Sequence, residues 1–427
     1  MDVKTRVERA YKENASSLIS ALMGVVRDLD FAEDVLQDAI ILALKNWGTD
    51  PPTNPAGWLL TTARRKAIDR IRHQKMSSSK EAAIQLFQSQ LSGDEDADAL
   101  EGYGDEGLRL LFTCCHPSLS QEAQVALTLK TVCGLSILEI SNAFLVNEAT
   151  LSKRIGRAKT KIKLAAIPYE IPPLEKLLER MNAVLAVIYL VFNAGYHSSG
   201  PELVKLDLCQ EAIRLSDRLN HLMAQQSPTI SKHISALESQ ALGVLMKLNH
   251  ARIRSRISDV GELVTLEEQN RSLWDHEVIE KEAMILADIL RKANLGPYQL
   301  QAAIAALHAS AHSSKGTDWI QIVGLYNELF RFIPTDIVRL NRAAAVAMAY
   351  STEAGLKEIQ AIEDGGALKY YSLLPAAKAD LLRRQKKTEE ALVYYKHAIA
   401  LASGEKEIDY YKGRIKDILE ASSKTFI

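Results

Sequence analysis

Apolar side chains recur every three or four positions along most of the chain, as they do on the buried face of an amphipathic helix. Near the N-terminus two segments follow this pattern, 31–47 and 58–75, and a loop with three prolines separates them. Their expected buried stripes consist of Val35, Ala39, Leu42, Leu60, Ala63, Ala67 and Ile71. Alternation typical of strands is not evident in the sequence, so we predict an all-α fold.

Changes in composition divide the chain into four parts. The stretch from Met76 to Glu106 is rich in Ser, Gly and acidic residues, which is typical of a linker. Pro168, Pro172 and Pro173 mark a second boundary. We therefore predict an N-terminal helical domain (1–76), an acidic linker (77–106), a second helical domain (107–166) and a helical C-terminal part (167–427).

The second helical domain ends in the pattern of a helix-turn-helix. Ile137, Ile140 and Phe144 would be the apolar stripe of a first short helix, and a turn at 145–147 follows. Asn147 is suited to cap a second helix, because its side chain accepts a hydrogen bond from an unpaired backbone N–H. The buried stripe of this second helix would consist of Leu151, Ile155, Ala158 and Ile162.

The remaining positions of the second helix form a polar and basic face. A recognition helix places polar residues near its N-terminal end against base edges, and basic residues further along against phosphates. From this pattern we predict DNA binding through Asn147, Glu148, Thr150, Ser152, Lys153, Arg154, Arg157, Lys159 and Lys161. The alternative interpretation is a solvated basic helix without a partner.

The overall charge changes this picture little. The 427 residues include 52 basic and 53 acidic side chains, so the positive charge of this helix is a local feature. The N-terminus is polar, and the apolar run from Ala183 to Phe192 is shorter than the roughly 20 residues that span a bilayer. We interpret that run as a buried helix and expect a cytoplasmic protein.

The cysteines suggest packing more than metal chemistry. Cys114, Cys115 and Cys133 lie near His116 in the sequence, but adjacent cysteines point to different sides of a helix and lack the spacing of zinc ligands. We therefore expect buried thiols and predict no metal site, no cofactor and no catalytic residue. The C-terminal part contains no phosphate loop or nucleophile elbow, so we do not expect an enzyme.

The end of the C-terminal part resembles tetratricopeptide repeats, which are stacked helix pairs. Small and bulky residues fall at the positions that this repeat requires. They are Ala379, Leu382, Ala391, Tyr395 and Ala398, with a partial upstream match at Tyr326, Pro334, Leu340 and Ala344. A generic alanine-rich bundle is the alternative. Tyr196 and His197 are the most site-like residues of this part, and we interpret them as a loop with a satisfied histidine.

Two segments resemble the conserved regions of bacterial extracytoplasmic-function sigma factors, which direct RNA polymerase to promoters. The stretches AEDVLQDAIILALKNW and NPAGWLLTTARRKAIDRIRHQ are similar to region 2, and LSILEISNAFLVNEATLSKRIGRAK is similar to region 4. The resemblance covers about residues 5–165. The C-terminal part resembles the helical, tetratricopeptide-like extension of one subgroup.

The resemblance implies roles for both regions. In region 2, Glu33, Asp34, Gln37 and Asp38 would dock on the clamp helices of the largest polymerase subunit. The loop from Trp47 to Gly57 would capture a flipped base of the minus-ten element. Basic residues of the following helix would hold the melted strand through its phosphates. They are Arg64, Arg65, Lys66, Arg70 and Arg72.

Region 4 would place its second helix in the major groove of the minus-thirty-five element. Some positions depart from the family pattern, namely Lys66, Ala149, Ser152 and Lys153, and they bear on which promoter sequence is read. We thus predict an alternative sigma factor whose helical extension regulates or supports initiation. The extension is expected to bind a protein or peptide partner. The alternative is a helix-turn-helix regulator with a sensing repeat domain that is not a sigma factor.

Overall fold

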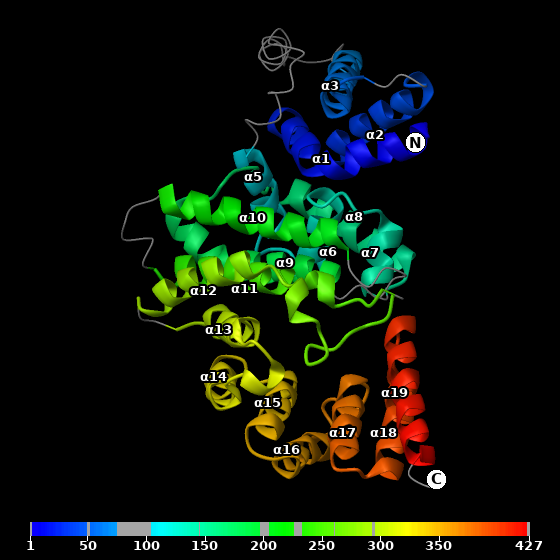
Figure 1. Ribbon diagram of the computed structural model, residues 1–427. Coiled ribbons are helices and arrows are strands. Elements are labelled where there is room, and N and C mark those ends of the chain that lie inside the picture. The colour runs from blue at the N-terminus through cyan, green and yellow to red at the C-terminus, as the bar shows by residue number, and fades with distance from the viewer. Residues whose placement is uncertain are drawn as a thin grey trace. The chain divides into compact units, whose positions relative to one another are not determined.

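The computed structural model describes residues 2–48, 52–74, 104–144, 146–196, 205–225, 233–259, 261–292 and 295–424 (Figure 1). Across these ranges the regular structure is helical, apart from one antiparallel β-bridge between Ile257 and Leu263. The predicted all-α class is therefore confirmed. The chain divides into two compact units, Met1–Ala194 with Asp217–Leu219 and Gly195–Ser216 with Asn220–Ile427.

In the first unit, three helices pack against one another as a bundle (Figure 1). They are α1 (Val3–Val26), α2 (Leu29–Asn46) and α3 (Pro55–Gln74). Side-chain carboxylates cap two of them: Asp2 accepts from the Thr5 backbone N–H at 2.7 Å, and Asp28 accepts from that of Phe31 at 3.2 Å. Pro55, expected in the loop, is instead the first residue of α3, where a helix needs no backbone N–H.

The predicted stripes of α2 and α3 form much of this bundle's interior. Val35, Ala39, Ala63 and Ala67 are fully buried, and Leu60 is nearly so. Leu42 and Ile71, at the far ends of their stripes, are only half-buried. The sequence periodicity thus predicts the buried faces well in their middle turns.

Four further helices follow before residue 174. They are α5 (Gly104–Cys114), α6 (Gln121–Thr131), α7 (Ile137–Phe144) and α8 (Glu148–Leu164). Gly134, between α6 and α7, has φ of 69°, and a Cβ there would lie 2.5 Å from that of Ala15 in α1. Both the left-handed backbone and this close approach require glycine.

Helix α9 (Leu174–Tyr196) is longer than the apolar run noted in the sequence. This helix of 23 residues is long and apolar enough to cross a membrane. The core helix of a soluble protein passes the same test of length and composition. Met181, Val184, Leu185 and Ile188 are fully buried. This burial is what we expect of a core helix, in agreement with the sequence interpretation.

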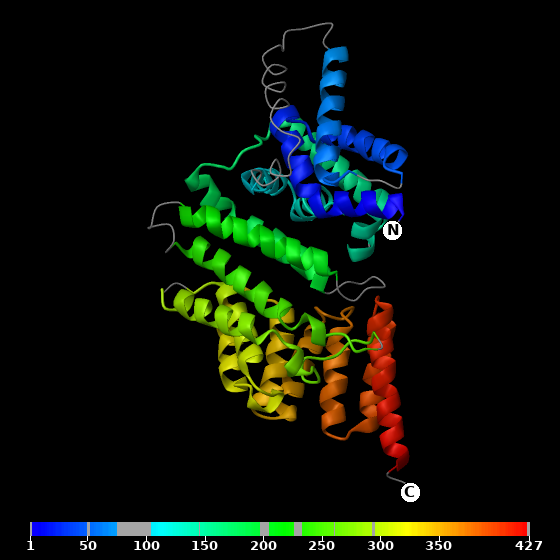
Figure 2. The same ribbon diagram turned by 45° about the horizontal axis from the view of Figure 1, so that its top comes forward.

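The second unit continues through helices up to the C-terminus (Figures 1 and 2). Its longer elements are α10 (Leu206–Gln225), α11 (Ile234–His250), α12 (His276–Leu290), α13 (Pro297–Ser310), α14 (Trp319–Phe332), α15 (Asp336–Ala349), α16 (Thr352–Gly365), α17 (Leu373–Arg384), α18 (Thr388–Leu401) and α19 (Glu405–Lys424). Three 3₁₀ turns are η3 (Ile253–Ser255), η4 (Arg271–Leu273) and η5 (Ser314–Gly316). From α13 onward each of the longer helices packs on its neighbour in sequence.

The helix pairs from α14 to α19 approach closely where side chains are small. A Cβ on Gly355 in α16 would lie 2.5 Å from that of Ala347 in α15. The positions singled out at 379, 382, 391, 395 and 398 all belong to one buried cluster. Ala344 is the exception: it is exposed, whereas Leu340, Ala343 and Ala347 of α15 are buried in one cluster with residues of α16. The tetratricopeptide assignment itself stays a prediction.

Candidate polymerase and nucleic-acid interfaces

The predicted helix-turn-helix is present as α7 and α8 in the first unit. The Asn147 side chain caps α8 by accepting a hydrogen bond from the Ala149 backbone N–H at 2.8 Å. Leu151, Ile155 and Ala158 are at most 4% exposed, and Ile162 is 8% exposed, so the stripe is buried as predicted. Leu145 of the predicted turn lies outside the described residues.

The first helix of the pair differs from expectation at one position. Ile140 is fully buried, but Phe144 is 38% exposed and does not complete the stripe. Its ring instead lines a cavity of about 410 Å³, together with Val125 of α6 and Leu151 of α8. Phe144 is therefore the last, peripheral contact of α7 and not part of its core.

Most of the predicted DNA-contacting side chains of α8 face solvent. Arg154 is half-buried, and Asn147, Glu148, Thr150, Ser152, Lys153, Arg157 and Lys161 are exposed. The Lys161 ammonium donates to the carbonyl of Ser118. The first turn thus presents polar side chains, and the basic ones follow from Lys153 onward, as the recognition of bases and phosphates requires.

Lys159 corrects the expectation of a uniformly exposed basic face. Its side chain is only 11% exposed, and its ammonium lies 2.8 Å from a Glu33 carboxylate oxygen and 3.0 Å from one of Asp30. Burial alone would lower the pKa of Lys159, but the two carboxylates raise it above its ordinary value. Lys159 therefore joins α8 to α2 through ion pairs.

A second ion pair joins the same two helices. Lys163, near the end of α8, lies 2.8 Å from the second carboxylate oxygen of Asp28, the residue that caps α2. Burial would raise the pKa of Asp28, but the Lys163 ammonium and backbone N–H groups lower it overall. The N-terminal end of α2 is thus bound by the C-terminal half of α8.

The basic residues of α3 also approach the acidic face of α2. The Arg70 guanidinium lies 2.6 Å from Asp38 and 3.7 Å from Asp34. Arg65 and Arg72 are exposed, whereas Arg64 and Lys66 are half-buried. Of the four predicted polymerase-docking residues, Asp34 and Gln37 are exposed, and Glu33 and Asp38 are half-buried in these pairs.

The start of the predicted base-capturing loop is held by aromatic packing. Trp47 is 3% exposed, and its ring meets that of Trp58 edge-on at 5.6 Å between centroids. Arg6 of α1 donates to the carbonyl of Gly48 at 2.8 Å. Residues 49–51 of this loop lie outside the described residues, as does the linker from 77 to 103.

Two of the three cysteines near His116 in the sequence are packed as predicted, and Cys133 is only half-buried. Cys114 and Cys115 are fully buried, and the Cys114 sulfur lies 3.3 Å from the Thr131 hydroxyl. Burial raises the pKa of the Cys114 thiol to about 12, which keeps it protonated at neutral pH. Among the described residues, no group of three or more His, Cys, Asp and Glu is placed to hold a metal ion.

One cluster was missed by the sequence reasoning. In the second unit, Glu267 and Glu268 form ion pairs with Arg384 of α17 and Arg414 of α19. The available signal was a pair of adjacent glutamates in a stretch between two helical patterns. Their partners lie more than a hundred positions away, so only the fold brings them together.

Of the predicted Tyr196 and His197, Tyr196 is buried beneath the Arg256 guanidinium, 3.7 Å from its ring centroid. His197 lies outside the described residues.

Comparisons with known proteins place families on both units. The family described as sigma-70 region 2 matches residues 10–76, and that described as sigma-70, region 4 matches residues 109–162. A family of unknown function, DUF6596, matches residues 180–290. No solved structure matches the chain.

Curated relatives fall into two groups by coverage. An uncharacterized protein of Rhizobium meliloti (strain 1021) is 40% identical over 95% of this chain and 94% of its own length. The "ECF RNA polymerase sigma factor SigK" of Mycobacterium sp. (strain KMS) is 29% identical over 34% of this chain and 75% of its own. The SigK of Mycobacterium tuberculosis (strain ATCC 25177 / H37Ra) is 27% identical over 36% and 81%. The chain thus combines the two shared regions with a long extension that the shorter relatives' matches do not reach.

Proposed function

The chain belongs to the sigma-70 family of RNA polymerase sigma factors, and on this premise we propose which of its surfaces meet polymerase and promoter. It is an alternative sigma factor of the extracytoplasmic-function type and not an enzyme. It binds core RNA polymerase and promoter DNA to direct transcription initiation. The interpretation as a regulator that is not a sigma factor is set aside, because region 2 matches residues 10–76.

The acidic face of α2 is the proposed polymerase-docking surface. Glu33, Asp34, Gln37 and Asp38 would contact the clamp helices of the largest subunit. The observation that supports this is the position of Asp34 and Gln37, exposed on a helix whose opposite face is buried. Because the polymerase acts in the cytoplasm, we infer the same location for this chain.

Promoter recognition is assigned to α3, the loop before it, and α8. Arg64, Arg65, Lys66, Arg70 and Arg72 would hold the melted minus-ten strand, and the loop from Trp47 to Gly57 would capture a flipped base. The exposed polar start of α8 would read the minus-thirty-five element in the major groove. The supporting observation is the capped helix with its four-residue stripe buried.

The ion pairs between α2 and α8 add a consequence. Glu33 cannot meet the polymerase while its carboxylate is bound to Lys159, and Lys159 cannot meet a phosphate while it is bound to Glu33. We infer that engagement with polymerase and promoter separates these partners. Lys159 is only 11% and Glu33 only 24% exposed, so separation requires that polymerase and DNA supply new partners for both charges.

A binding measurement tests the docking surface. We expect the double change Asp34→Ala with Gln37→Ala to weaken the affinity for core polymerase by about tenfold. Glu8→Ala, an exposed acidic position on α1, is the matched control and should leave the affinity unchanged. Equal affinities for the double variant and the wild-type chain would remove α2 as the docking surface.

The extension is proposed to regulate or support initiation. The chain ending after Tyr196 keeps α1 to α9 and lacks the remaining helices. Promoter-specific transcription by this truncated chain with core polymerase should differ from that of the full chain. A rise would indicate inhibition in cis, and a fall would indicate a required role; unchanged transcription would contradict both.

A further inference from the structure

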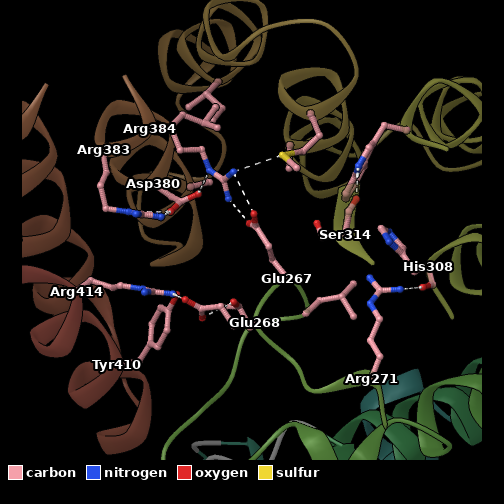
Figure 3. Close-up of a pocket in the computed structure, with 18 residues that line it drawn as sticks. Glu267, Glu268, Arg271, His308, Ser314, Asp380, Arg383, Arg384, Tyr410 and Arg414 are labelled. Carbon is pink, nitrogen blue, oxygen red and sulfur yellow. Dashed lines mark hydrogen bonds and ion pairs between the residues drawn. The ribbon is translucent and has the colours of Figure 1, made fainter. Parts of the chain in front are cut away.

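Within the second unit, one segment without helical structure lies against the C-terminal helices. Its described residues are 257–259 and 261–270, between η3 and η4, and a β-bridge pairs Ile257 with Leu263. Beyond this bridge, Glu267 and Glu268 extend toward α17 and α19, as Figure 3 shows. The segment therefore presents two adjacent carboxylates to the helix pairs.

Each carboxylate meets a different arginine. Glu267 pairs with Arg384, the last residue of α17, through both guanidinium Nη atoms. Glu268 pairs with Arg414 of α19. The Thr265 hydroxyl orients the Glu268 carboxylate by donating a hydrogen bond to it at 2.6 Å.

The helices hold both arginines in place independently of the segment. Arg384 Nε lies 2.8 Å from Asp380 Oδ2, and Arg414 Nε donates to the Tyr410 hydroxyl oxygen at 2.9 Å. Arg384 also contacts the sulfur of Met348 in α15 at 3.6 Å. Arginines fixed in this way lose little conformational freedom when they bind a carboxylate.

The groove around these pairs is cationic once the segment's own charges are set aside. Its lining includes four arginines and three carboxylates, the arginines being Arg271, Arg383, Arg384 and Arg414. Without Glu267 and Glu268, Asp380 is the only carboxylate left in the lining, and Asp417, 3.7 Å from Arg414, is one further acid beside it, so the four arginines still outnumber the nearby acids. A site with this excess of positive charge favours an acidic ligand.

The segment fills the groove only in part. A cavity of about 540 Å³ remains beside it, with Trp319, Ala344 and Met348 among its apolar lining residues. Both glutamate side chains are 44% exposed, and Arg384 and Arg414 are 27% and 15% exposed, so the ion pairs that hold the segment to α17 and α19 are open to solvent on the carboxylate side. Such contacts exchange readily with those of a competing ligand.

We propose that this groove binds an acidic peptide of a partner protein, two adjacent carboxylates of which take the places of Glu267 and Glu268. In this structure the chain's own segment occupies the site in cis. Stacked helix pairs bind peptides in such grooves, and Ala344 and Met348 would contact the flanking residues of the ligand. This inference goes beyond the proposed function, and its test uses no transcription.

The test measures peptide binding by the full-length chain. The probe is a fluorescently labelled synthetic peptide with the sequence LVTLEEQ, that of residues 263–269. In the wild-type chain the segment competes with the probe for the groove. Only chains with an open groove bind the probe, so the apparent affinity is the intrinsic affinity multiplied by the fraction of open chains. We expect the variant Glu267→Gln with Glu268→Gln to bind the probe about tenfold more tightly or better.

Three comparisons make the result decisive. The same peptide with both glutamates replaced by glutamine should bind at least about tenfold more weakly to this variant, because it cannot pair with Arg384 and Arg414. Adding Arg384→Gln to the variant should abolish probe binding, whereas Arg331→Gln, at an exposed arginine of α14, should not. Glu277→Gln with Glu280→Gln, on exposed positions of α12, should leave wild-type affinity unchanged.

Two results with the double variant would overturn the proposal, and a third applies to the single variant. One is equal affinity of the wild-type chain and the Glu267→Gln/Glu268→Gln variant for the probe, with the variant's thermal melt unaltered. The other is equal binding of the acidic and glutamine peptides. If the double variant melts early, the single variant Glu267→Gln replaces it, and absence of probe binding there also counts against the site. Any of these outcomes would leave the ion pairs with a purely structural role.

Discussion

At the scale of single residues, Lys159 connects the two surfaces proposed to act in initiation. Its position on α8 is predicted by helical periodicity, but its burial between Asp30 and Glu33 is not. Those carboxylates lie more than 120 positions away, and local patterns carry no information about such pairings. By contrast, the exposure of Thr150 and Ser152 follows from the stripe alone and is confirmed.

Replacing Lys159 tests whether this pair competes with polymerase. We expect Lys159→Ala to increase the affinity for core polymerase, measured without DNA at low salt, by a factor of about 3 to 10. The reason is that Glu33 loses its internal partner. Lys153→Ala, at an exposed position of the same helix, is the control. An unchanged or weakened affinity of the Lys159 variant would contradict competition.

His308 predicts a pH dependence of stability for the second unit. Burial, together with Arg252 and Arg271, lowers the pKa of His308 from 6.5 to about 4. In the window between these values the unfolded state binds a proton and the folded state does not. The contribution of neutral His308 to the free energy of unfolding is therefore complete above pH 6.5 and is lost as the pH falls toward 4.

Denaturation measured at several pH values tests the direction of this pH dependence. The shift from 6.5 to about 4 corresponds to about 3.5 kcal/mol at most, from roughly 1.4 kcal/mol per pKa unit. We expect His308→Gln to flatten the rise of the free energy of unfolding between pH 4 and 6.5 relative to the wild-type chain. His397→Gln, at an exposed position of α18, should keep the wild-type slope. Parallel curves for wild type and His308→Gln would exclude the assignment.

At the scale of elements, the helix-turn-helix was the best-predicted part of the molecule. Its cap at Asn147 and its four-residue stripe are as expected, because capping and periodicity are local properties. The start of α3 at Pro55 and the exposure of Phe144 differ, because helix ends depend on neighbouring packing. The predicted small-residue position Ala344 is off by one residue, because Ala343 is the residue buried against α16.

Two classes of residue on α8 should affect DNA binding differently. We expect Arg157→Ala to weaken binding to all promoter duplexes and to reduce the salt-dependence slope by about one. Thr150→Ala should instead change the preference between minus-thirty-five sequences, because its side chain lies near the N-terminal end of the helix. Binding to a duplex library at several salt concentrations separates the two. Uniform losses from both variants would contradict the division of roles.

The close packing of α15 on α16 also makes a prediction. A Cβ at position 355 would meet Ala347 at 2.5 Å and the Ala343 carbonyl oxygen at 2.9 Å, so Gly355→Ala should destabilise the chain by about 1–3 kcal/mol. In α14, nothing lies within 4 Å of a Cβ on Gly324, so Gly324→Ala should stabilise by about 0.5–1 kcal/mol. Urea denaturation of both variants measures the difference, and equal effects would argue against this packing.

At the scale of the whole molecule, a sigma factor of ordinary regions 2 and 4 is joined to a long helical extension. The two regions were identified from sequence because their function depends on short motifs. The groove of the extension was not, because it is built from Arg384, Arg414 and a distant pair of glutamates. Its chemistry becomes visible only when the chain is folded.

The most direct test of the central claim is run-off transcription with purified core polymerase on a promoter library, with and without the full chain. We predict discrete transcripts from a subset of promoters only when the chain is present. Transcription that stays promoter-independent, with no binding of the chain to core polymerase, would contradict its action as a sigma factor.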